Sequence, residues 1–455
     1  MIVSYVVGSG FGNKSQLSAA MPSALVWRVI GWFFMTYKIS PLDVSDLPNY
    51  PRPCPFCTGV LECRDFLLPG FKALGSYCCV ECGGTFFGDL PSSYGMFDPV
   101  LYSIEKETVF GGEKLPFWRQ WTKLLHSSGQ KSSPLVTFVE IKKIRKPAIL
   151  NCLEKPYGHM LIKLFQSEHY LEHFSEYDLI LIIPSSMAWL VPEGLAGIIR
   201  VDWSTEFQDY WCHSLVNEVN ALQANFPSLH FCPTLPNPDA NKINITKYTG
   251  TEPFERGAWS RSLVRPTVVF IWRDDRTWSA NDSEKLKGQV LLINSLAKLL
   301  LQFFPRLNFN VAGFCENKAP LSEGINDLRC DVYSDEMERS LCALYASAQV
   351  VVGVHGSNMI LPSALAGATV ELVPPGRWHN AWTASFSRND NDSVATMLYN
   401  RFVPTSIAPD DLAQLVRTIM IFSPWGQILG MKPNCDIGLA NPDELRDAVS
   451  KLQAL

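Results

Sequence analysis

The sequence feature that most constrains the fold is a short apolar run, Val350–Val354, that stops abruptly at His355-Gly356-Ser357. A helix-compatible segment follows, and a second apolar run, Gly367–Pro374, carries Glu371 near its end. Short apolar runs rich in β-branched residues are typical of buried parallel strands. The pattern therefore predicts a strand, a tight turn, a helix and a second strand, with the polar side chains gathered where the strands end. In open parallel sheets ligands bind outside the carboxyl ends of the strands.

The turn after the first of these strands has the chemistry of an anion site. Gly356 allows a ligand to approach the backbone closely, and the helix that follows directs free N–H groups and its positive dipole end toward the same place. We therefore expect a phosphate-bearing ligand here. The alternative is that His355 is only a hydrogen-bonded histidine at a strand–helix turn; the clustering of His355–Asn358 with Glu371 favours a site.

Length and composition indicate an ordinary globular protein with more than one domain. A chain of 455 residues exceeds what a single hydrophobic core usually supports, so we expect two or three domains. Hydrophobic residues make up 47% of the chain and charged residues 18%, which excludes an intrinsically disordered protein. The formal net charge of -5 provides no basic footprint for nucleic acid, so no nucleic-acid partner is expected.

The N-terminal region and the cysteines bear on cellular location. No secretory signal pattern is evident, and thirteen cysteines without an export signal predict a reducing, cytoplasmic compartment. The apolar segment Ala24–Met35 is too short to span a bilayer and is interrupted by Arg28. Its aromatic residues suit either a helix packed on the protein or peripheral contact with the inner face of a membrane.

Two C-x-x-C pairs near the N-terminus predict a zinc ribbon. The two-residue spacer directs both thiolates of a pair at one ion, and the distance between the pairs is close to the zinc-ribbon range. Four thiolates close a tetrahedral shell without a position for a catalytic water, so we expect a structural zinc. The alternative is a set of buried free thiols, and either Cys78 or Cys63 can replace a ligand. The expected ligands are Cys54, Cys57, Cys79 and Cys82.

Apolar strands alternate with amphipathic helices after the ribbon, in two blocks separated by a segment rich in Pro, Asn, Thr and Gly. This alternation predicts α/β domains with parallel, doubly wound sheets. The expected organisation is an N-terminal segment at 1–48, the zinc ribbon at 49–92, a first Rossmann-like domain with an irregular lead-in at 93–245, a linker at 246–265, a second Rossmann-like domain at 266–435, and a C-terminal helix at 436–455.

Several of these residues resemble the signature of glycosyltransferase family 61. That signature is a strand ending in Gly-x-His-Gly-Ala, a short helix, and a second strand that begins with Gly-Ala and ends in Glu-Leu. Val350–Asn358 and Gly367–Leu372 are similar to it, with a serine in place of the alanine, and Leu344–Ala348 resembles the end of the preceding helix. Weaker similarities lie at Tyr157-Gly158-His159 and at the strand-end arginine segment Ile271–Arg276. The zinc ribbon is not a family feature, which indicates a distant branch.

The resemblance implies a GT-B-like α/β fold, with two Rossmann-like domains facing across a cleft, the first for the acceptor and the second for the nucleotide-sugar donor. It further implies an inverting, metal-independent glycosyltransferase of polysaccharide or surface glycan synthesis, acting on a glycan or lipid-linked acceptor. No catalytic metal is expected, since Asp390-Asn391-Asp392 lies in a polar loop and not at a strand end. The alternatives are a GT-B transferase that uses a nucleoside-monophosphate sugar, and a non-catalytic zinc-ribbon module that binds carbohydrate or protein.

The transfer chemistry assigns roles to the donor-side residues. Arg273 and Arg276 suit the diphosphate, because guanidinium groups pair bidentately with phosphate oxygens; ion pairs with the neighbouring aspartates are the alternative. Ser357 and Asn358 would stabilise the negative charge of the leaving group. Glu371 would accept hydrogen bonds from ribose hydroxyls, as a strand-end acid does in dinucleotide-binding folds.

Two histidines are the expected catalytic residues. His159 stands at the head of a first-domain helix and is our prediction for the base, because histidine titrates near neutral pH and the acceptor should bind to that domain. His355 is better placed to contact the phosphate or the sugar of the donor.

Overall fold

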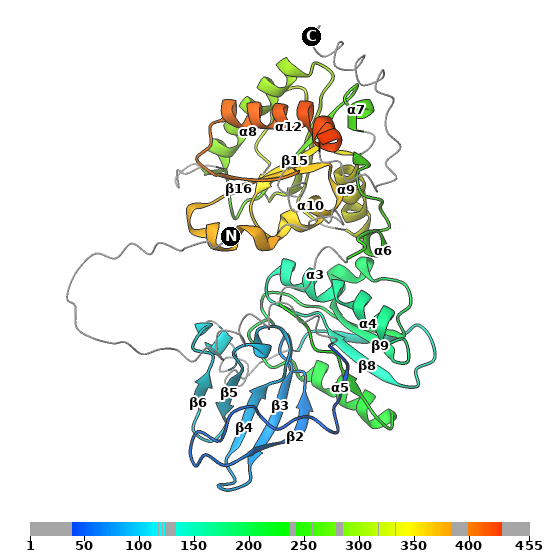
Figure 1. Ribbon diagram of the computed structural model, residues 1–455, viewed down its shortest axis with the longest axis vertical. Coiled ribbons are helices and arrows are strands. Elements are labelled where there is room, and N and C mark those ends of the chain that lie inside the picture. The colour runs from blue at the N-terminus through cyan, green and yellow to red at the C-terminus, as the bar shows by residue number, and fades with distance from the viewer. Residues whose placement is uncertain are drawn as a thin grey trace, which may run out of the picture. The chain divides into compact units, whose positions relative to one another are not determined.

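The computed structural model describes residues 39–116, 118–120, 122, 133–236, 243–256, 259–278, 285–316, 318–332, 334–384 and 399–429. The chain divides into a unit Met1–Ile39 and a unit Ser40–Leu455, and all the labelled elements belong to the second unit (Figure 1). Three of the sequence expectations lie outside the described residues: the packed or interfacial helix at Ala24–Met35, the loop Asp390–Asp392 and the C-terminal helix at 436–455.

The first α/β domain contains a sheet with the strand order β1-β11-β8-β9-β10-β7. Two of its strands, β8 and β9, are labelled in Figure 1. Four neighbouring strands are parallel: β11 (His230–Phe231), β8 (Pro147–Asn151), β9 (Asp178–Pro184) and β10 (Gly197–Val201). The antiparallel edge strands are β1 (Leu42–Asp43) and β7 (Val136–Glu140). β8 is buried along its whole length, as expected of a strand covered on both faces. The helices are α3 (Tyr157–Phe165), α4 (Ser167–His173), η2 (Ser185–Leu190) and α5 (His213–Asn225).

The second α/β domain has six parallel strands in the order β14-β13-β12-β15-β16-β17. In chain order this is 3-2-1-4-5-6, the arrangement of Rossmann folds. The strands are β12 (Thr267–Ile271), β13 (Asn308–Phe314), β14 (Ile325–Cys330), β15 (Val350–Val354), β16 (Ala368–Val373) and β17 (Asn400–Pro404). The longer helices are α8 (Lys285–Phe303), α9 (Asp335–Ser347) and α12 (Pro409–Leu429), and α6 (Thr246–Thr249) and α7 (Trp259–Ser262) fall in the expected linker.

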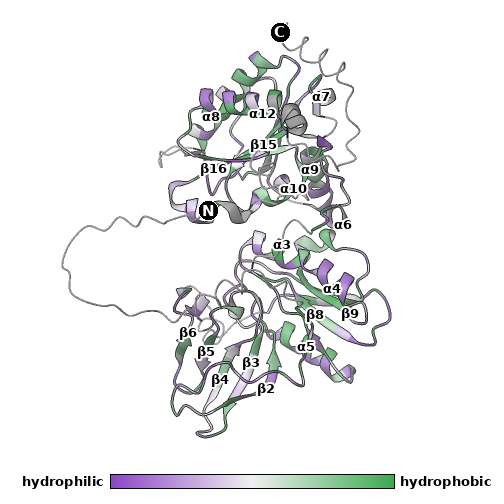
Figure 2. Ribbon diagram, in the orientation of Figure 1, coloured by the Kyte–Doolittle hydropathy of each residue, from purple (hydrophilic) through white to green (hydrophobic). Residues whose placement is uncertain are grey.

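The helices of the second domain are amphipathic. Figure 2 shows hydrophilic residues beside hydrophobic ones on α8, and Leu291 of this helix is 67% exposed. The buried residues of α8 recur at helical spacing, as a face packed on the sheet requires: Val290, Ile293, Leu296, Ala297 and Leu300. Among the helices that the structure describes, none combines the length and the apolar character needed to cross a membrane.

The unit of strand, turn, helix and strand around His355 lies in the middle of the second sheet, and every residue of β15 and β16 is buried. Two Rossmann-like domains in one chain, preceded by a small cysteine-bearing module, confirm the expected α/β, GT-B-like fold class. The exact residue limits of the domains stay predictions.

The cysteine-bearing module contains a five-stranded antiparallel sheet in the order β2-β3-β4-β5-β6. The sequence placed the ribbon at 49–92 and an irregular segment after it, whereas β5 and β6 of that segment continue the same sheet. All four residues of β5 are buried, so apolar packing forms a strand where the Pro, Gly and Ser residues around it suggested a loop. We term residues 49–113 the ribbon module. Its elements are β2 (Leu61–Leu67), β3 (Leu74–Cys79), β4 (Thr85–Asp89), η1 (Ser93–Met96), β5 (Val100–Ser103) and β6 (Thr108–Gly111).

Candidate functional site

The carboxyl ends of β12 and β15 meet where the strand order of the second sheet reverses. The two strands are parallel neighbours, but β13 lies on the outer side of β12 and β16 on the outer side of β15. Ligands of open α/β sheets bind at such a switch point. Trp272–Arg276 follows β12 and His355–Asn358 follows β15, so the residues predicted in both segments lie at this point.

Two arginines join the segment after β12 to the segment after β15. Arg273 donates from Nη1 to Oδ1 of Asn358 at 2.6 Å, and Arg276 donates from Nη1 to the backbone carbonyl oxygen of His355 at 3.1 Å. Asp275 forms an ion pair with Arg273 at 2.5 Å and lies 4.0 Å from Arg276. The ion pair considered as an alternative therefore exists, yet both guanidinium groups also reach the turn after β15.

A third arginine lies close enough to Arg276 to affect its pKa. The pKa of Arg276 is lowered by burial and by the positive charges of Arg273 and Arg377, which outweigh the opposing effect of Asp275. Arg377 lies in η7 (Pro375–Ala384), just after β16, and the sequence analysis missed it. The sequence could have indicated Arg377, because this residue directly follows β16, a third parallel strand whose carboxyl end lies at the same edge of the sheet as those of β12 and β15. Three guanidinium groups gathered at the ends of neighbouring strands favour an anionic ligand.

Asn358 and Gly356 shape the space beside the arginines. Nδ2 of Asn358 is buried and has no hydrogen-bond partner among the described residues. A buried unpaired polar group costs about 1–3 kcal/mol, so an acceptor on a ligand would stabilise the site. Gly356 has a φ of +156°, and a Cβ there would lie 2.4 Å from Nη1 of Arg273 and 2.8 Å from Nη1 of Arg276. Glycine is therefore required for both guanidinium groups to stay in place.

The helix expected after Gly356 is present and short. It consists of the 3-10 turn η6 (Ser357–Met359) and the six-residue α10 (Ile360–Leu365). The positive partial charge at a helix N-terminus comes from aligned peptide dipoles, and a helix as short as α10 has few of them. The arginines, and not the helix N-terminus, supply the main attraction for an anion.

His355 and Glu371 form a buried pair. Nδ1 of His355 lies 2.6 Å from Oε2 of Glu371, and the two side chains are 4% and 0% exposed. The register explains the contact, because Glu371 pairs with Gly353 and His355 lies two residues further along the same face of β15. The sequence suggested a ribose contact for Glu371, and that contact stays a prediction. In the structure the buried carboxylate lies against Nδ1 of His355 and orients the imidazole.

His159 lies in the first turn of α3, in the other α/β domain. Burial lowers the pKa of His159 against the opposing effect of the Glu154 carboxylate, so the ring is neutral near pH 7 and has a nitrogen free of a proton. Gly158 lies against Ser357, because a Cβ built at Gly158 would come within 2.6 Å of the Ser357 Cβ. The Gly-His step of α3 is thus beside the turn after β15, although no hydrogen bond joins His159 to the described part of the second domain.

The four cysteines predicted as metal ligands form one cluster in the ribbon module. Their sulfur atoms lie within 4.8 Å of one another, with Cys54 3.7 Å from Cys82 and Cys57 3.3 Å from Cys79. Sulfurs around a tetrahedral zinc are about 3.8 Å apart, given a Zn–S distance of about 2.3 Å. The cluster therefore fits one tetrahedral metal ion, and a closed shell of four thiolates suits a structural role.

The two other cysteines considered as ligands lie outside this cluster. Sγ of Cys78 lies 3.8 Å from the carbonyl oxygens of Cys79 and Gly83, and Sγ of Cys63 lies 3.5 Å from that of Asp65. The side chains of a strand alternate between its two faces, so neighbouring Cys78 and Cys79 point to opposite sides of β3.

No protein-family model matches the sequence, and no curated protein is similar to it. Solved structures to which this chain is similar include the ADP-heptose lipopolysaccharide heptosyltransferase II of E. coli, at 12% identity and a TM-score of 0.36, over 61% of this chain and 99% of the other. A glycosyl transferase of family 9 from Veillonella parvula is 9% identical, with a TM-score of 0.33 over 69% of this chain and 98% of the other. The iron-containing dodecameric glycosyltransferase TibC of enterotoxigenic E. coli is 9% identical, with a TM-score of 0.29 over 90% and 99%.

Proposed function

We propose that this chain is a glycosyltransferase that takes its sugar from a nucleotide-sugar donor. The observation that carries the proposal is the convergence of Arg273, Arg276 and the unpaired amide of Asn358 at the switch point of a Rossmann sheet. Guanidinium groups bind phosphate oxygens bidentately, and the amide offers a further donor. The resemblance to glycosyltransferase family 61 supports the same assignment, and we propose a distant branch of that family.

We infer that the donor carries a nucleoside diphosphate. Arg273, Arg276 and Arg377 supply three guanidinium groups, of which Arg273 is ion-paired with Asp275. Several guanidinium groups can pair with both phosphates of a diphosphate, whereas a nucleoside-monophosphate sugar offers a single phosphate. The number of guanidinium groups is therefore our reason to propose the diphosphate over the alternative considered from the sequence.

The reaction we propose is a single displacement at the anomeric carbon. His159 accepts the proton of the acceptor hydroxyl, whose oxygen forms the new bond to the anomeric carbon. The bond from that carbon to the phosphate oxygen breaks, and its electron pair leaves with the nucleoside diphosphate. Arg273 and Arg276 stabilise the departing charge, so the chemistry needs no divalent cation. One displacement inverts the configuration at the anomeric carbon.

His355 and Glu371 complete the donor side of this proposal. Glu371 accepts the Nδ1 proton and holds the imidazole so that Nε2 faces the phosphate or the sugar of the donor. Ser357, beside Gly158 of α3, lies where donor and acceptor would meet. The acceptor we propose is a glycan or a lipid-linked glycan in polysaccharide or surface glycan synthesis. The free thiols of the described cysteines suit a reducing, cytoplasmic compartment, and any membrane contact would be peripheral.

We further propose that the four-thiolate cluster holds one structural zinc. Zinc favours tetrahedral thiolate shells, and the ribbon module has a small core for its metal to supplement. The proposed ligands are Cys54, Cys57, Cys79 and Cys82.

Nucleotide binding tests the central proposal. Titration calorimetry with UDP, GDP, ADP and CMP should find one diphosphate that binds clearly more tightly than CMP. Arg273→Ala removes a charge-assisted contact of about 1.5–3 kcal/mol, so it should weaken the binding of that nucleotide by about 10- to 100-fold. Arg306→Ala is the matched control, because this exposed arginine directly precedes β13 and so lies at the amino ends of the strands, away from the site.

Transfer itself is tested by incubating the protein with a mixed pool of nucleotide sugars and candidate glycans, followed by mass spectrometry of the products. The proposal predicts glycan products and a free nucleoside diphosphate that depend on Arg273. A protein that binds none of the nucleotides and forms no product would favour the alternative, a non-catalytic binding module.

A further inference from the structure

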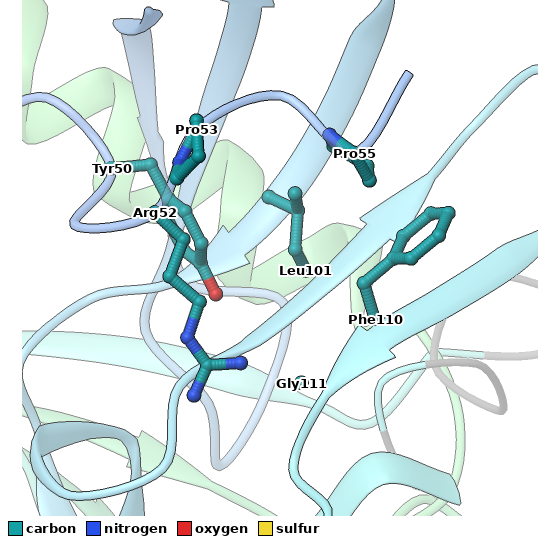
Figure 3. Close-up of a pocket in the computed structure, with 7 residues that line it drawn as sticks. All are labelled: Tyr50, Arg52, Pro53, Pro55, Leu101, Phe110 and Gly111. Carbon is teal, nitrogen blue, oxygen red and sulfur yellow. The ribbon is translucent and has the colours of Figure 1, made fainter. Parts of the chain in front are cut away.

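The ribbon module contains a cavity that the proposed function does not use. Its volume is about 280 Å³. Figure 3 shows Leu101 of β5 and Phe110 of β6 facing the segment that carries Pro53 and Pro55, with the guanidinium of Arg52 beside Gly111. Tyr50 completes the wall. A cavity of this size admits one ring or one branched side chain, and most of its wall is hydrocarbon.

Apolar surface continues from this cavity across the metal-binding end of the module. The ring of Phe56, which lies between two of the cysteines, is 5.6 Å from the ring of Phe110 and 46% exposed. Val60 and Val80 are about half exposed, and a backbone hydrogen bond of 3.0 Å joins them. The exposed apolar residues of a soluble protein are usually scattered, so a group next to a cavity indicates an interaction site.

The polar groups of the cavity limit the chemistry of its occupant. Arg52 already pairs with Asp98 at 3.2 Å and with Glu113 at 3.8 Å, so its charge is balanced. Tyr50 is 5% exposed, and its hydroxyl has no hydrogen-bond partner among the described residues. A neutral acceptor such as a peptide carbonyl would satisfy that hydroxyl, whereas an anion gains little from a neutralised arginine.

The ribbon module as a whole carries more acidic than basic side chains, and Glu113 beside the cavity pairs with both Arg52 and Arg119 at 3.8 Å. Residues 49–113 contain eight acidic and four basic side chains, which corresponds to a formal charge of -4 before the thiolates are counted. Lys72 and Asp89 form a buried pair, so the imbalance lies at the surface. The exposed and half-exposed acids are Glu62, Asp65, Glu81, Glu105, Glu107 and Glu113. Such a field attracts cationic partners and repels phosphates.

These observations separate the candidate occupants. A sugar ring presents several hydroxyls, and each would lose water in a wall that offers one unpaired hydroxyl and one occupied arginine. A phospholipid or a phosphate-linked glycan lipid has the same sign of charge as the acidic ribbon module, which would repel it. An extended proline-containing peptide suits both the apolar wall and the acidic module. Its proline rings pack into grooves lined by aromatic and proline side chains, and lysine or arginine residues on either side can pair with acidic side chains.

We propose that the ribbon module docks an extended, proline-bearing segment of a partner protein that is flanked by lysine or arginine, with one apolar side chain in the cavity beside Phe110. The inference does not depend on the proposed sugar transfer. It assigns the module a recruiting function, in which the module holds this chain to a partner protein.

The test uses the full-length, metal-loaded protein and a labelled synthetic peptide that carries Pro-Leu-Pro between pairs of lysines. Fluorescence anisotropy should report saturable binding that weakens as salt is raised. Glu113→Lys reverses an exposed charge at the cavity, and Phe110→Ala removes one wall; each should weaken binding by about tenfold. Glu193→Lys is the matched control, because it makes the same charge change at an exposed residue of the first α/β domain and should leave the affinity unchanged.

Metal content and the thermal midpoint are measured for every variant, and Glu113→Lys keeps the test decisive if Phe110→Ala does not fold. The same peptide with glutamates in place of the lysines should bind at least about tenfold more weakly. The proposal is overturned if the lysine peptide fails to bind at millimolar concentration, or if Glu113→Lys and Glu193→Lys bind it equally. The proposal would also be overturned if the cavity bound a different occupant: cellohexaose, phosphatidylglycerol vesicles or a second copy of the chain. In that case Phe110→Ala would abolish the binding of that occupant.

Discussion

Replacing Gly356 by alanine adds one methyl group between the two arginines of the candidate site. The new Cβ would stand 2.4 Å from Nη1 of Arg273 and 2.8 Å from Nη1 of Arg276. Ordinary van der Waals contact begins at 3.4 Å, so the Arg273 nitrogen must retreat by about 1 Å. That displacement breaks its 2.6 Å hydrogen bond to Asn358 and moves the guanidinium from its place at the switch point.

The expected loss can be worked out from these contacts. A hydrogen bond that involves a charged group contributes about 1.5–3 kcal/mol, so one misplaced guanidinium should weaken binding of the nucleotide by about 10- to 100-fold. The atoms that clash are the far ends of flexible side chains, so the fold should survive. The φ of +156° adds a strain for alanine of about 1–3 kcal/mol, which lowers the thermal midpoint without unfolding the domain.

The assay is titration calorimetry of wild type and Gly356→Ala with whichever of UDP, GDP, ADP and CMP the wild type binds. Gly376→Ala is the matched control, because a Cβ at Gly376 meets nothing within 4 Å and this residue lies next to Arg377. The control should bind the nucleotide as the wild type does. Unchanged affinity in a folded Gly356→Ala protein would refute the reasoning, since the arginines would then not be the groups that hold the ligand.

Three further predictions follow from the structure. Glu371→Gln keeps the shape of the buried pair but removes the carboxylate that orients His355. We expect kcat to fall by about tenfold or more while the dissociation constant of the nucleotide stays unchanged. A parallel loss of nucleotide binding would contradict the positioning role of Glu371. Cys57→Ser should lose one bound zinc per chain and lower the thermal midpoint, whereas Cys78→Ser should keep the metal, as measured by elemental analysis; equal zinc in both would be inconsistent with the four-thiolate cluster. Burial and the Asp335 charge raise the pKa of Glu338 from 4.5 to about 7. Between these two pH values the folded state keeps a proton that the unfolded state releases. The free energy of unfolding should therefore fall by about 3 kcal/mol as the pH rises from 4.5 to 7. Urea unfolding near pH 4.5 and above pH 7 should show that Glu338→Gln lacks this decrease, and an identical pH dependence in both proteins would exclude it.

Residues that are close neighbours in the chain were sufficient to predict much of the fold and part of the site. Val350–Val354 is short, apolar and β-branched, which suits only a strand buried on both faces, and it lies in the centre of the second sheet. The two C-x-x-C pairs predicted the sulfur cluster, because each knuckle is a local turn whose spacer sets the direction of both thiols. The positions of Arg273 and His355 followed in the same way, since each comes directly after a recognisable strand.

The tertiary structure alone decided what these residues face. The carboxylate of Glu371 lies against His355, because the register of β15 and β16 sets it opposite Gly353, where no side chain intervenes. Arg377 contributes its charge because a third parallel strand ends at the same edge. Likewise β5 and β6 extend the ribbon sheet and form its cavity, although their sequence suggested a loop. These outcomes depend on strand register and on packing between residues that are far apart in the chain. The composition of a short segment does not determine either of them.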